Sequence, residues 1–253
     1  MQLMTFNLRF ANPQDGPNHW EYRKELVVDT ILRCAPDLLA TQEGTVPQLD
    51  YLARRLPDYR ALTVHRRVDP TFQYPTIFFR HGVLEVRDSG DFHLSETPGV
   101  HRSKSWESAF PRIVTYGRFR LTGQGPWFFF INTHLDHVSA SARLAGARLI
   151  ARYFSQRREP LILAGDFNEP PAAPVHREFV GPHRLFLDTW QAVHASEEDA
   201  ATQHHFDGHP RGSRIDWILV TPPFRVERAE IIRYNQGGRY PSDHFPYLAE
   251  VVY

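Results

Sequence analysis

Leu161-Ile162-Leu163-Ala164-Gly165-Asp166-Phe167-Asn168 is the stretch of this 253-residue chain that decides its fold. Its first four residues form an apolar run of the length expected for a buried strand, and Pro170-Pro171 ends the segment soon afterwards. Side chains two positions apart in an extended segment point to the same face, so Asp166 and Asn168 are predicted to leave the strand end together. A carboxylate beside a carboxamide suits holding a hard metal ion, or a water molecule next to a phosphate.

Several other apolar runs of the chain also end in polar residues. Active sites of sheet-based enzymes gather where strand ends meet loops, so these residues are candidates for one shared site. Taken singly, each of them is explained equally well as a cap or a turn residue. Taken together, the pattern predicts a functional site built from Asn7, Glu43, His134, Asp166, Asn168, Asp216, Asp243 and His244.

The composition limits the classes of function. Hydrophobic residues make up 42% of the chain, which supports a sizeable core, and the formal net charge is +0. Tight binding to long nucleic acid without sequence preference needs a broad basic surface, which this balance does not indicate. The single cysteine, Cys34, excludes an internal disulfide and a four-cysteine zinc site. With no signal peptide and no span of membrane length, we expect a cytoplasmic monomer with no membrane partner.

The apolar periodicity predicts strands and helices mixed along the whole length. Helices are expected over residues 21–34, 46–56 and 139–154. Strands are expected over residues 3–8, 38–43, 61–64, 76–79, 84–92, 113–121, 127–131, 161–164, 215–220, 226–232 and 245–252, and residues 171–212 show no regular pattern. There is no internal repeat and no linker-like segment, so we expect one domain, residues 1–253, of the α/β or α+β class, with helices outside a sheet core.

Oxygen donors dominate the predicted site. Glu43 closes a very apolar strand, where a carboxylate is costly to bury unless it is paired or bound to a cation. The oxygen-rich set of Glu43, Asn7, Asp166, Asn168 and Asp243 suits Mg²⁺ or Mn²⁺, which prefer hard oxygen ligands.

Two histidines and two arginines complete the set of candidates. His244 is suited to act as a general base near neutral pH, and Asp216 is placed in sequence to orient its ring. Arg9 and Arg112 are candidates to hold the non-bridging oxygens of a phosphate, with structural ion pairs as the competing interpretation.

Other hydrolase classes match less well. Asn132-Thr133-His134-Leu135-Asp136-His137 approaches a dinuclear-zinc motif, but Asn132 replaces its first histidine, and zinc sites need their full ligand set. A glycosidase with paired carboxylates would explain neither the amides Asn7 and Asn168 nor the two histidines. The phosphate-binding loop of nucleotide-driven enzymes is absent. A non-catalytic scaffold would be expected to carry damage at the strand ends, and none is visible.

Six motifs in order resemble those of the endonuclease/exonuclease/phosphatase superfamily, whose best-known fold is that of DNase I. The motifs are Thr5-Phe6-Asn7, Thr41-Gln42-Glu43, Asn132-Thr133-His134, Gly165-Asp166-Phe167-Asn168, Arg214-Ile215-Asp216 and Ser242-Asp243-His244. The resemblance covers essentially the full length, and two further stretches, residues 15–20 and 88–112, look like a bacterial branch of the superfamily.

The resemblance implies an α+β fold, a four-layer α/β/β/α sandwich of two packed mixed sheets with helices outside. It implies a metal, Mg²⁺ or Mn²⁺, held mainly by Glu43 with Asn7 and Asp243 in or near its shell. Asp166 and Asn168 would position the attacking water or the phosphate. His244, paired with Asp216, would act as base or as a charged phosphate ligand, and His134 would stabilise the transition state or assist the leaving group.

The implied activity is metal-dependent hydrolysis of a phosphoester. From the sequence we place a phosphodiester of a nucleic acid or nucleotide-like substrate first, and a phosphomonoester of a sugar, inositol or lipid headgroup second. Apurinic endonucleases of the superfamily carry an acid two residues after the motif asparagine, where this chain has Arg9, and this weakens an abasic-site interpretation.

Overall fold

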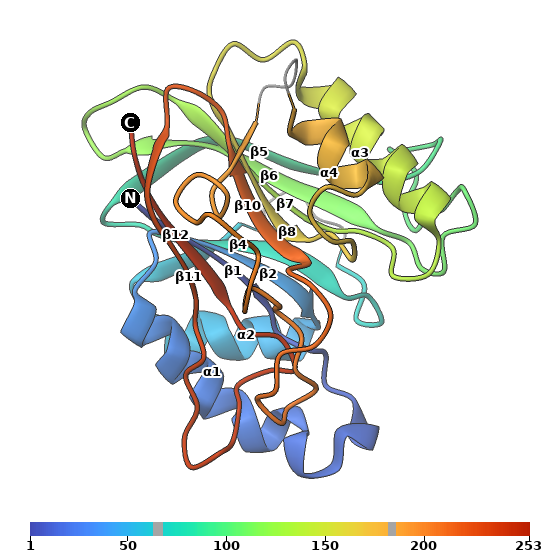
Figure 1. Ribbon diagram of the computed structural model, residues 1–253, viewed down its shortest axis with the longest axis vertical. Helices are drawn as coiled ribbons and strands as arrows, with labels where there is room; N and C mark the ends of the chain where they lie inside the picture. The colour runs from blue at the N-terminus through green and yellow to red at the C-terminus, as the bar shows by residue number, and fades with distance from the viewer. Residues whose placement is uncertain (63–67, 182–185) are drawn as a thin grey trace.

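Two six-stranded mixed β-sheets pack face to face, with helices on both outer sides (Figure 1). The computed structural model describes residues 1–62, 68–181 and 186–253. Helices α1 and α2 cover one sheet, and α3 and α4 lie on the far side of the other (Figure 1). The predicted four-layer α/β/β/α sandwich is therefore confirmed.

The first sheet has the strand order β11-β12-β1-β2-β4-β3. Its strands are β1 (Gln2–Asn7), β2 (Leu38–Gly44), β3 (Tyr59–Ala61), β4 (Tyr74–Arg80), β11 (Arg225–Ile231) and β12 (Tyr247–Val252). Strand β1 runs parallel to β2 and antiparallel to β12, so the carboxyl ends of β1 and β2 lie at the same edge.

The second sheet has the strand order β5-β6-β7-β8-β10-β9. Its strands are β5 (Leu84–His93), β6 (Ile113–Leu121), β7 (Phe128–His134), β8 (Leu161–Asp166), β9 (Leu187–Asp188) and β10 (Asp216–Val220). Strands β7 and β8 are parallel, and β10 runs antiparallel to β8. The helices are α1 (Trp20–Cys34), α2 (Val46–Arg55), α3 (Ala140–Phe154), α4 (Pro174–Phe179) and the 3₁₀ helix η1 (Pro13–Asn18).

Central strands are apolar on both faces because each sheet is covered on both sides. In β1, Leu3 packs between the sheets while its neighbour Met4 packs under the first pair of helices. In β8, Ile162 packs between the sheets while Leu163 joins the core beneath α3 and α4. The continuous apolar runs seen in the sequence are thus the expected signature of strands buried on two faces.

A buried polar contact joins the two sheets below the site. The Gln42 side chain donates a 2.8 Å hydrogen bond to Asn132 Oδ1 and a 3.0 Å bond to Thr5 Oγ1. Asn132 Nδ2 in turn donates to the carbonyls of Thr41 and Thr76. Buried amides are costly unless satisfied in this way, so the network fixes the sheets' relative position.

The predicted elements are found with small shifts at their ends. Strand β7 continues through Asn132–His134, three residues past the predicted end. The stretch 171–212, expected to be irregular, contains α4 and the short β9. Of the strand expected over residues 61–64, only Ala61 belongs to β3, and residues 63–64 lie outside the described ranges. None of the helices in the described ranges has the length and apolar character needed to cross a membrane.

Candidate functional site

The carboxyl ends of β1 and β2 bring Asn7 and Glu43 together. Asn7 pairs with Gln42 in the parallel register, so Glu43 lies one residue further along the neighbouring strand. Glu43 has a left-handed backbone, with φ at +62°, at a bulge in the pairing of β2 with β4. Such bulges redirect side chains at sheet edges. The Asn7 amide nitrogen lies 3.3 Å from Glu43 Oε1, and the Phe10 amide donates to Glu43 Oε2 at 3.0 Å.

The second sheet supplies three more candidates at the same edge. His134 and Asp166 are partners in the parallel register of β7 and β8, and Asp216 is the antiparallel partner of Asp166. Gly165 permits this close approach: its φ is +149°, and a Cβ there would lie 2.0 Å from the Thr133 carbonyl oxygen. Only glycine therefore fits in the motif immediately before Asp166.

Asp166 joins the two halves of the site. Its Oδ2 accepts a 3.0 Å hydrogen bond from Asn7 Nδ2 and lies 3.4 Å from His134 Nε2. Burial and the nearby Asp216 carboxylate raise the pKa of Asp166 to about 7. A carboxylate with such a pKa exchanges a proton readily near neutral pH.

Asp216 and His244 form a buried pair. His244 Nδ1 lies 2.8 Å from Asp216 Oδ2, as predicted from the sequence. Burial disfavours the charged imidazole, but the Asp216 carboxylate outweighs it and raises the pKa of His244 to about 10. His134 behaves in the opposite way, because burial and the neighbouring Arg112 lower its pKa well below the usual value. The Asp216 carboxylate thus favours the charged form of His244, whereas burial and Arg112 favour the neutral form of His134.

Asn168 does not leave the strand as predicted. Strand β8 ends at Asp166, and Asn168 has a left-handed backbone with φ at +51°. The chain turns because Asp166 Oδ1 accepts a 2.9 Å hydrogen bond from the Asn168 amide, a common way for Asp to start a turn. Asn168 Nδ2 donates to the Leu135 carbonyl at 3.0 Å, which ties the β8 loop to the β7 loop.

The donor set fits a divalent cation. Asp166, Asp216 and His244 are buried, and one ligand atom from each lies within 4.8 Å of the others, the one such group of His, Cys, Asp or Glu among the described residues. Asp216 Oδ1 is buried and has no hydrogen-bond partner among the described residues. With Glu43 nearby, three carboxylates converge, and a hard cation would compensate their charge. His244 is the weakest donor of the group, because its raised pKa keeps the imidazole protonated.

Arg9 and Asp243 lie at the rim of the site. Arg9 makes two hydrogen bonds to Asp15, at 3.0 and 2.9 Å, and its Nη1 lies 3.8 Å from Asp243 Oδ2. Asp243 also accepts a 3.3 Å bond from Ser242, whose hydroxyl is shared with the Asn7 carbonyl at 2.6 Å. Asp15 therefore binds one edge of the Arg9 guanidinium, through Nε and Nη2, and Nη1 lies nearest to Asp243.

Arg112 approaches from the β7 side. Its Nε lies 3.8 Å from Asp136 Oδ2, and its Nη2 lies 3.1 Å from His137 Nδ1. Burial lowers the pKa of Arg112, and the carboxylates of Asp136, Glu43 and Asp166 partly oppose this. Asp136 accepts several backbone hydrogen bonds, and among the described residues it forms no metal-binding group with His134 or His137. The dinuclear-zinc alternative therefore has no structural support in this part of the chain.

Two residues that the sequence did not single out hold the site in place. The Gln203 side-chain nitrogen lies 3.3 Å from His244 Nε2, and turning the amide over presents its oxygen to a charged imidazole. Arg23 is buried in α1, and its guanidinium donates to the carbonyls of Leu8 and Arg9 at 2.6 Å and of Pro241 at 2.8 Å. Neither belongs to a recognisable motif, because their roles depend on loops that meet only in the folded chain.

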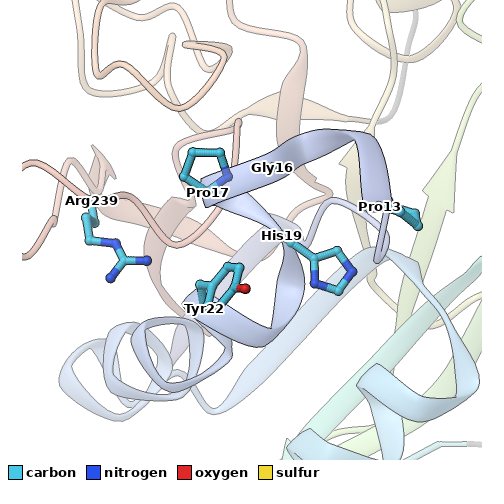
Figure 2. A pocket seen from close by; sticks show the side chains of 6 residues that line it. All are labelled: Pro13, Gly16, Pro17, His19, Tyr22 and Arg239. Atoms are coloured by element: carbon cyan, nitrogen blue, oxygen red, sulfur yellow. The ribbon is translucent and has the colours of Figure 1, made fainter.

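A surface cavity of about 720 Å³ contains none of the predicted site residues. It is lined by Pro13, Gly16, Pro17, His19, Tyr22 and Arg239. Figure 2 shows Arg239, from the loop before β12, on the opposite side of Tyr22 from His19. The cavity lacks the buried titratable groups that catalysis requires, so the strand-end cluster remains the candidate active site.

A protein-family model described as the Endonuclease/Exonuclease/phosphatase family matches residues 4–244. Among solved structures, a family protein from Bacteroides thetaiotaomicron shares 30% identity, with a TM-score of 0.91 and coverage of 99% of this chain and 97% of its own. A mannosyl-6-phosphatase from Bacteroides thetaiotaomicron VPI-5482 shares 30% identity, with a TM-score of 0.89 and coverage of 100% of both chains.

Among curated proteins, the Nocturnin of Drosophila melanogaster is 27% identical over 281 residues, covering 91% of this chain. The chain spans only 42% of the length of that relative. The two bacterial structures therefore match this chain over nearly their whole length, whereas the Nocturnin relative matches over less than half of its own.

Proposed function

This chain belongs to the endonuclease/exonuclease/phosphatase family and is a phosphoester hydrolase, and we propose that it removes the phosphate from a sugar phosphomonoester. The observation that carries the proposal is the similarity, over both full chains, to a mannosyl-6-phosphatase. This reverses the order favoured by the sequence alone, in which a phosphodiester came first.

The metal-binding part of the proposed site is Glu43 and Asn7, with Asp166 facing them and Asp243 nearby. Mg²⁺ or Mn²⁺ bound there would neutralise charge on the phosphate oxygens. Glu43 is held in position by the Phe10 amide, and Asn7 by its contact with Asp166. These contacts supply the orientation that a metal site needs from its surroundings.

In the proposed mechanism, Asp166 orients the attacking water and accepts its proton, which its raised pKa favours near neutral pH. His244 is a charged ligand of a phosphate oxygen, because Asp216 keeps its imidazole protonated. Of the two roles that the family resemblance leaves open for His244, base or charged phosphate ligand, we therefore propose the second. Neutral His134 and the guanidinium of Arg112 face the phosphate from the β7 side. Asn168 fixes the loop that follows His134 through its bond to the Leu135 carbonyl.

The test is a phosphate-release assay with Mg²⁺ or Mn²⁺, comparing mannose 6-phosphate with bis-p-nitrophenyl phosphate. We expect faster turnover of the monoester, loss of turnover with EDTA, and loss in the Asp166→Asn variant. The exposed residue Glu198 gives a matched charge control, Glu198→Gln, which should retain the activity. Faster turnover of the diester would overturn the proposal and restore the order favoured by the sequence.

A further inference from the structure

An exposed pair of rings lies beside the proposed site. Phe110 has 57% of its surface exposed, although it is a large apolar side chain. Its ring stacks on His137, with centroids 5.7 Å apart and planes 20° from parallel. The next residue, Val138, is 65% exposed. Together, Phe110, His137 and Val138 form an apolar ledge, here called the ring platform.

One buried carboxylate holds both loops that carry the platform. Asp136 Oδ2 accepts hydrogen bonds from the amides of Ala109 and Phe110, at 3.0 and 3.4 Å. Its Oδ1 accepts from the amides of Val138 and Ser139, at 3.0 and 2.7 Å. The backbone of both loops is therefore fixed beneath the two rings, and the rings stack on each other. Such preorganisation lowers the entropy lost when a ligand binds.

The platform is continuous with the catalytic groups. Arg112 Nη2 contacts His137 Nδ1 at 3.1 Å, and the Arg112 guanidinium lies 6.0 Å from the centre of the Phe110 ring. His134, at the end of β7, is only three residues before His137. A phosphate held by Arg112 would thus place the group attached to it over or next to the platform.

We propose that the ring platform packs against the sugar ring of the substrate and so selects esters in which the phosphate is carried by a sugar. This inference rests on the proposed sugar-phosphatase function. A sugar presents C–H groups on one face and hydroxyls at its edge. The negative face of Phe110 attracts the C–H groups, and the exposed His137 offers a polar edge to the hydroxyls.

The alternative is that Phe110 only covers the Asp136 turn. An exposed ring gains little from burial, so a covering role predicts a small effect that is the same for every substrate. A sugar-binding role predicts an effect that depends on whether the substrate has a ring. The two interpretations therefore differ in a measurable way.

The experiment compares mannose 6-phosphate with glycerol 3-phosphate, a monoester without a ring, in the Mg²⁺-loaded enzyme. Loss of a stacking partner is expected to raise KM for mannose 6-phosphate about 10-fold in Phe110→Ala, with kcat nearly unchanged. The glycerol ester should change less than about 2-fold, and Phe110→Tyr should restore the sugar KM. Tyr253→Ala is the matched control, because Tyr253 is also exposed but follows the far end of β12.

An equal change for both esters, or no change for either, would overturn the platform. If the wild type hydrolyses neither ester, the proposed function is wrong whether or not the platform binds sugars. The platform is then tested by binding alone. Calorimetry with the Asp166→Asn variant would compare the affinity for mannose 6-phosphate with and without Phe110→Ala. Weaker binding of the sugar phosphate alone supports the platform; equal binding, or no binding of either ester, contradicts it.

Discussion

His244 and Asp216 meet through a 2.8 Å contact between Nδ1 and Oδ2, with both side chains buried. The contact joins the loop before β12 in one sheet to the start of β10 in the other. It also sets the charge of the imidazole, because the carboxylate raises the pKa of His244 to about 10. The pair therefore links the packing of the two sheets to the charge state of the site.

Asp216→Asn should reduce kcat by about 100-fold or more, because the charged ligand of the phosphate is lost. The pH profile of kcat should also shift, in a direction that follows from the pKa of His244. A pKa raised by Asp216 keeps His244 protonated up to about pH 10, so removing the carboxylate lowers that pKa and moves the alkaline limb of kcat to lower pH. An alkaline limb that stays in place would show that His244 does not act in its charged form.

Glu43→Gln should raise the Mg²⁺ concentration needed for half-maximal activity by about 10-fold or more, because a neutral amide is a weaker metal ligand. The measurement is activity against Mg²⁺ concentration, together with direct Mn²⁺ binding by electron paramagnetic resonance. The exposed Glu96→Gln variant is the control. Unchanged Mn²⁺ affinity would remove Glu43 from the metal site.

Arg23→Met should lower the free energy of unfolding by about 3 kcal/mol, since buried carbonyls of two loops would lose their donor. Urea unfolding measures this, with the exposed Arg54→Met as control. The activity of the variant at urea concentrations well below its unfolding midpoint should also be lower than that of the wild type, because Arg23 ties the loop after Asn7 to the loop before His244. A destabilisation equal to that of the control would show that the Arg23 hydrogen bonds to the two loops do not stabilise the fold.

Acid should destabilise the protein partly through His204. This side chain is fully buried, and its ring stacks on that of Phe245 with the ring centroids 3.9 Å apart. Its Nδ1 accepts a hydrogen bond from the Gly208 amide. Burial lowers its pKa to about 4, so from pH 7 to 5 the unfolded chain gains a proton that the folded chain does not. The free energy of unfolding should fall by about 1–2 kcal/mol over this window from this group.

The variant His204→Phe checks this. Its stability at any one pH will change for other reasons, so the informative quantity is the difference between urea unfolding at pH 7 and at pH 5. That difference should shrink relative to the wild type. An unchanged difference would mean that His204 takes up a proton equally in both states.

The sequence predicts the strand-end residues well because the parallel strands β1, β2, β7 and β8 place their carboxyl ends at one edge, where the antiparallel β10 and β12 begin. Asn7, Glu43, His134, Asp166, Asp216 and His244 all meet there, as the motif order implies. The prediction of an extended backbone at Asn168 is wrong, because Asp166 starts a turn there. The roles of these residues in metal binding and catalysis stay predictions.

Other parts of the site could not be predicted from a pattern. Arg23 occupies an ordinary position in an amphipathic helix, and only the folded loops show that carbonyls surround its guanidinium. Gln203 lies in a stretch without periodicity, and its contact with His244 spans 41 residues of sequence. Long-range contacts of single polar residues leave no local signal, in contrast to the continuous apolar runs of the central strands.

The Gln42–Asn132 contact between the sheets has a consequence for how this enzyme can diversify. Asn7 and Glu43 belong to one sheet, whereas His134, Asp166 and Asp216 belong to the other, and a buried 2.8 Å bond beneath them fixes the spacing between the two sets. Hydrophobic packing alone would tolerate small sliding of the sheets, but a buried amide pair does not. Rim loops such as the one that carries Phe110 can therefore exchange residues, and with them substrates, while the distances needed for hydrolysis stay constant.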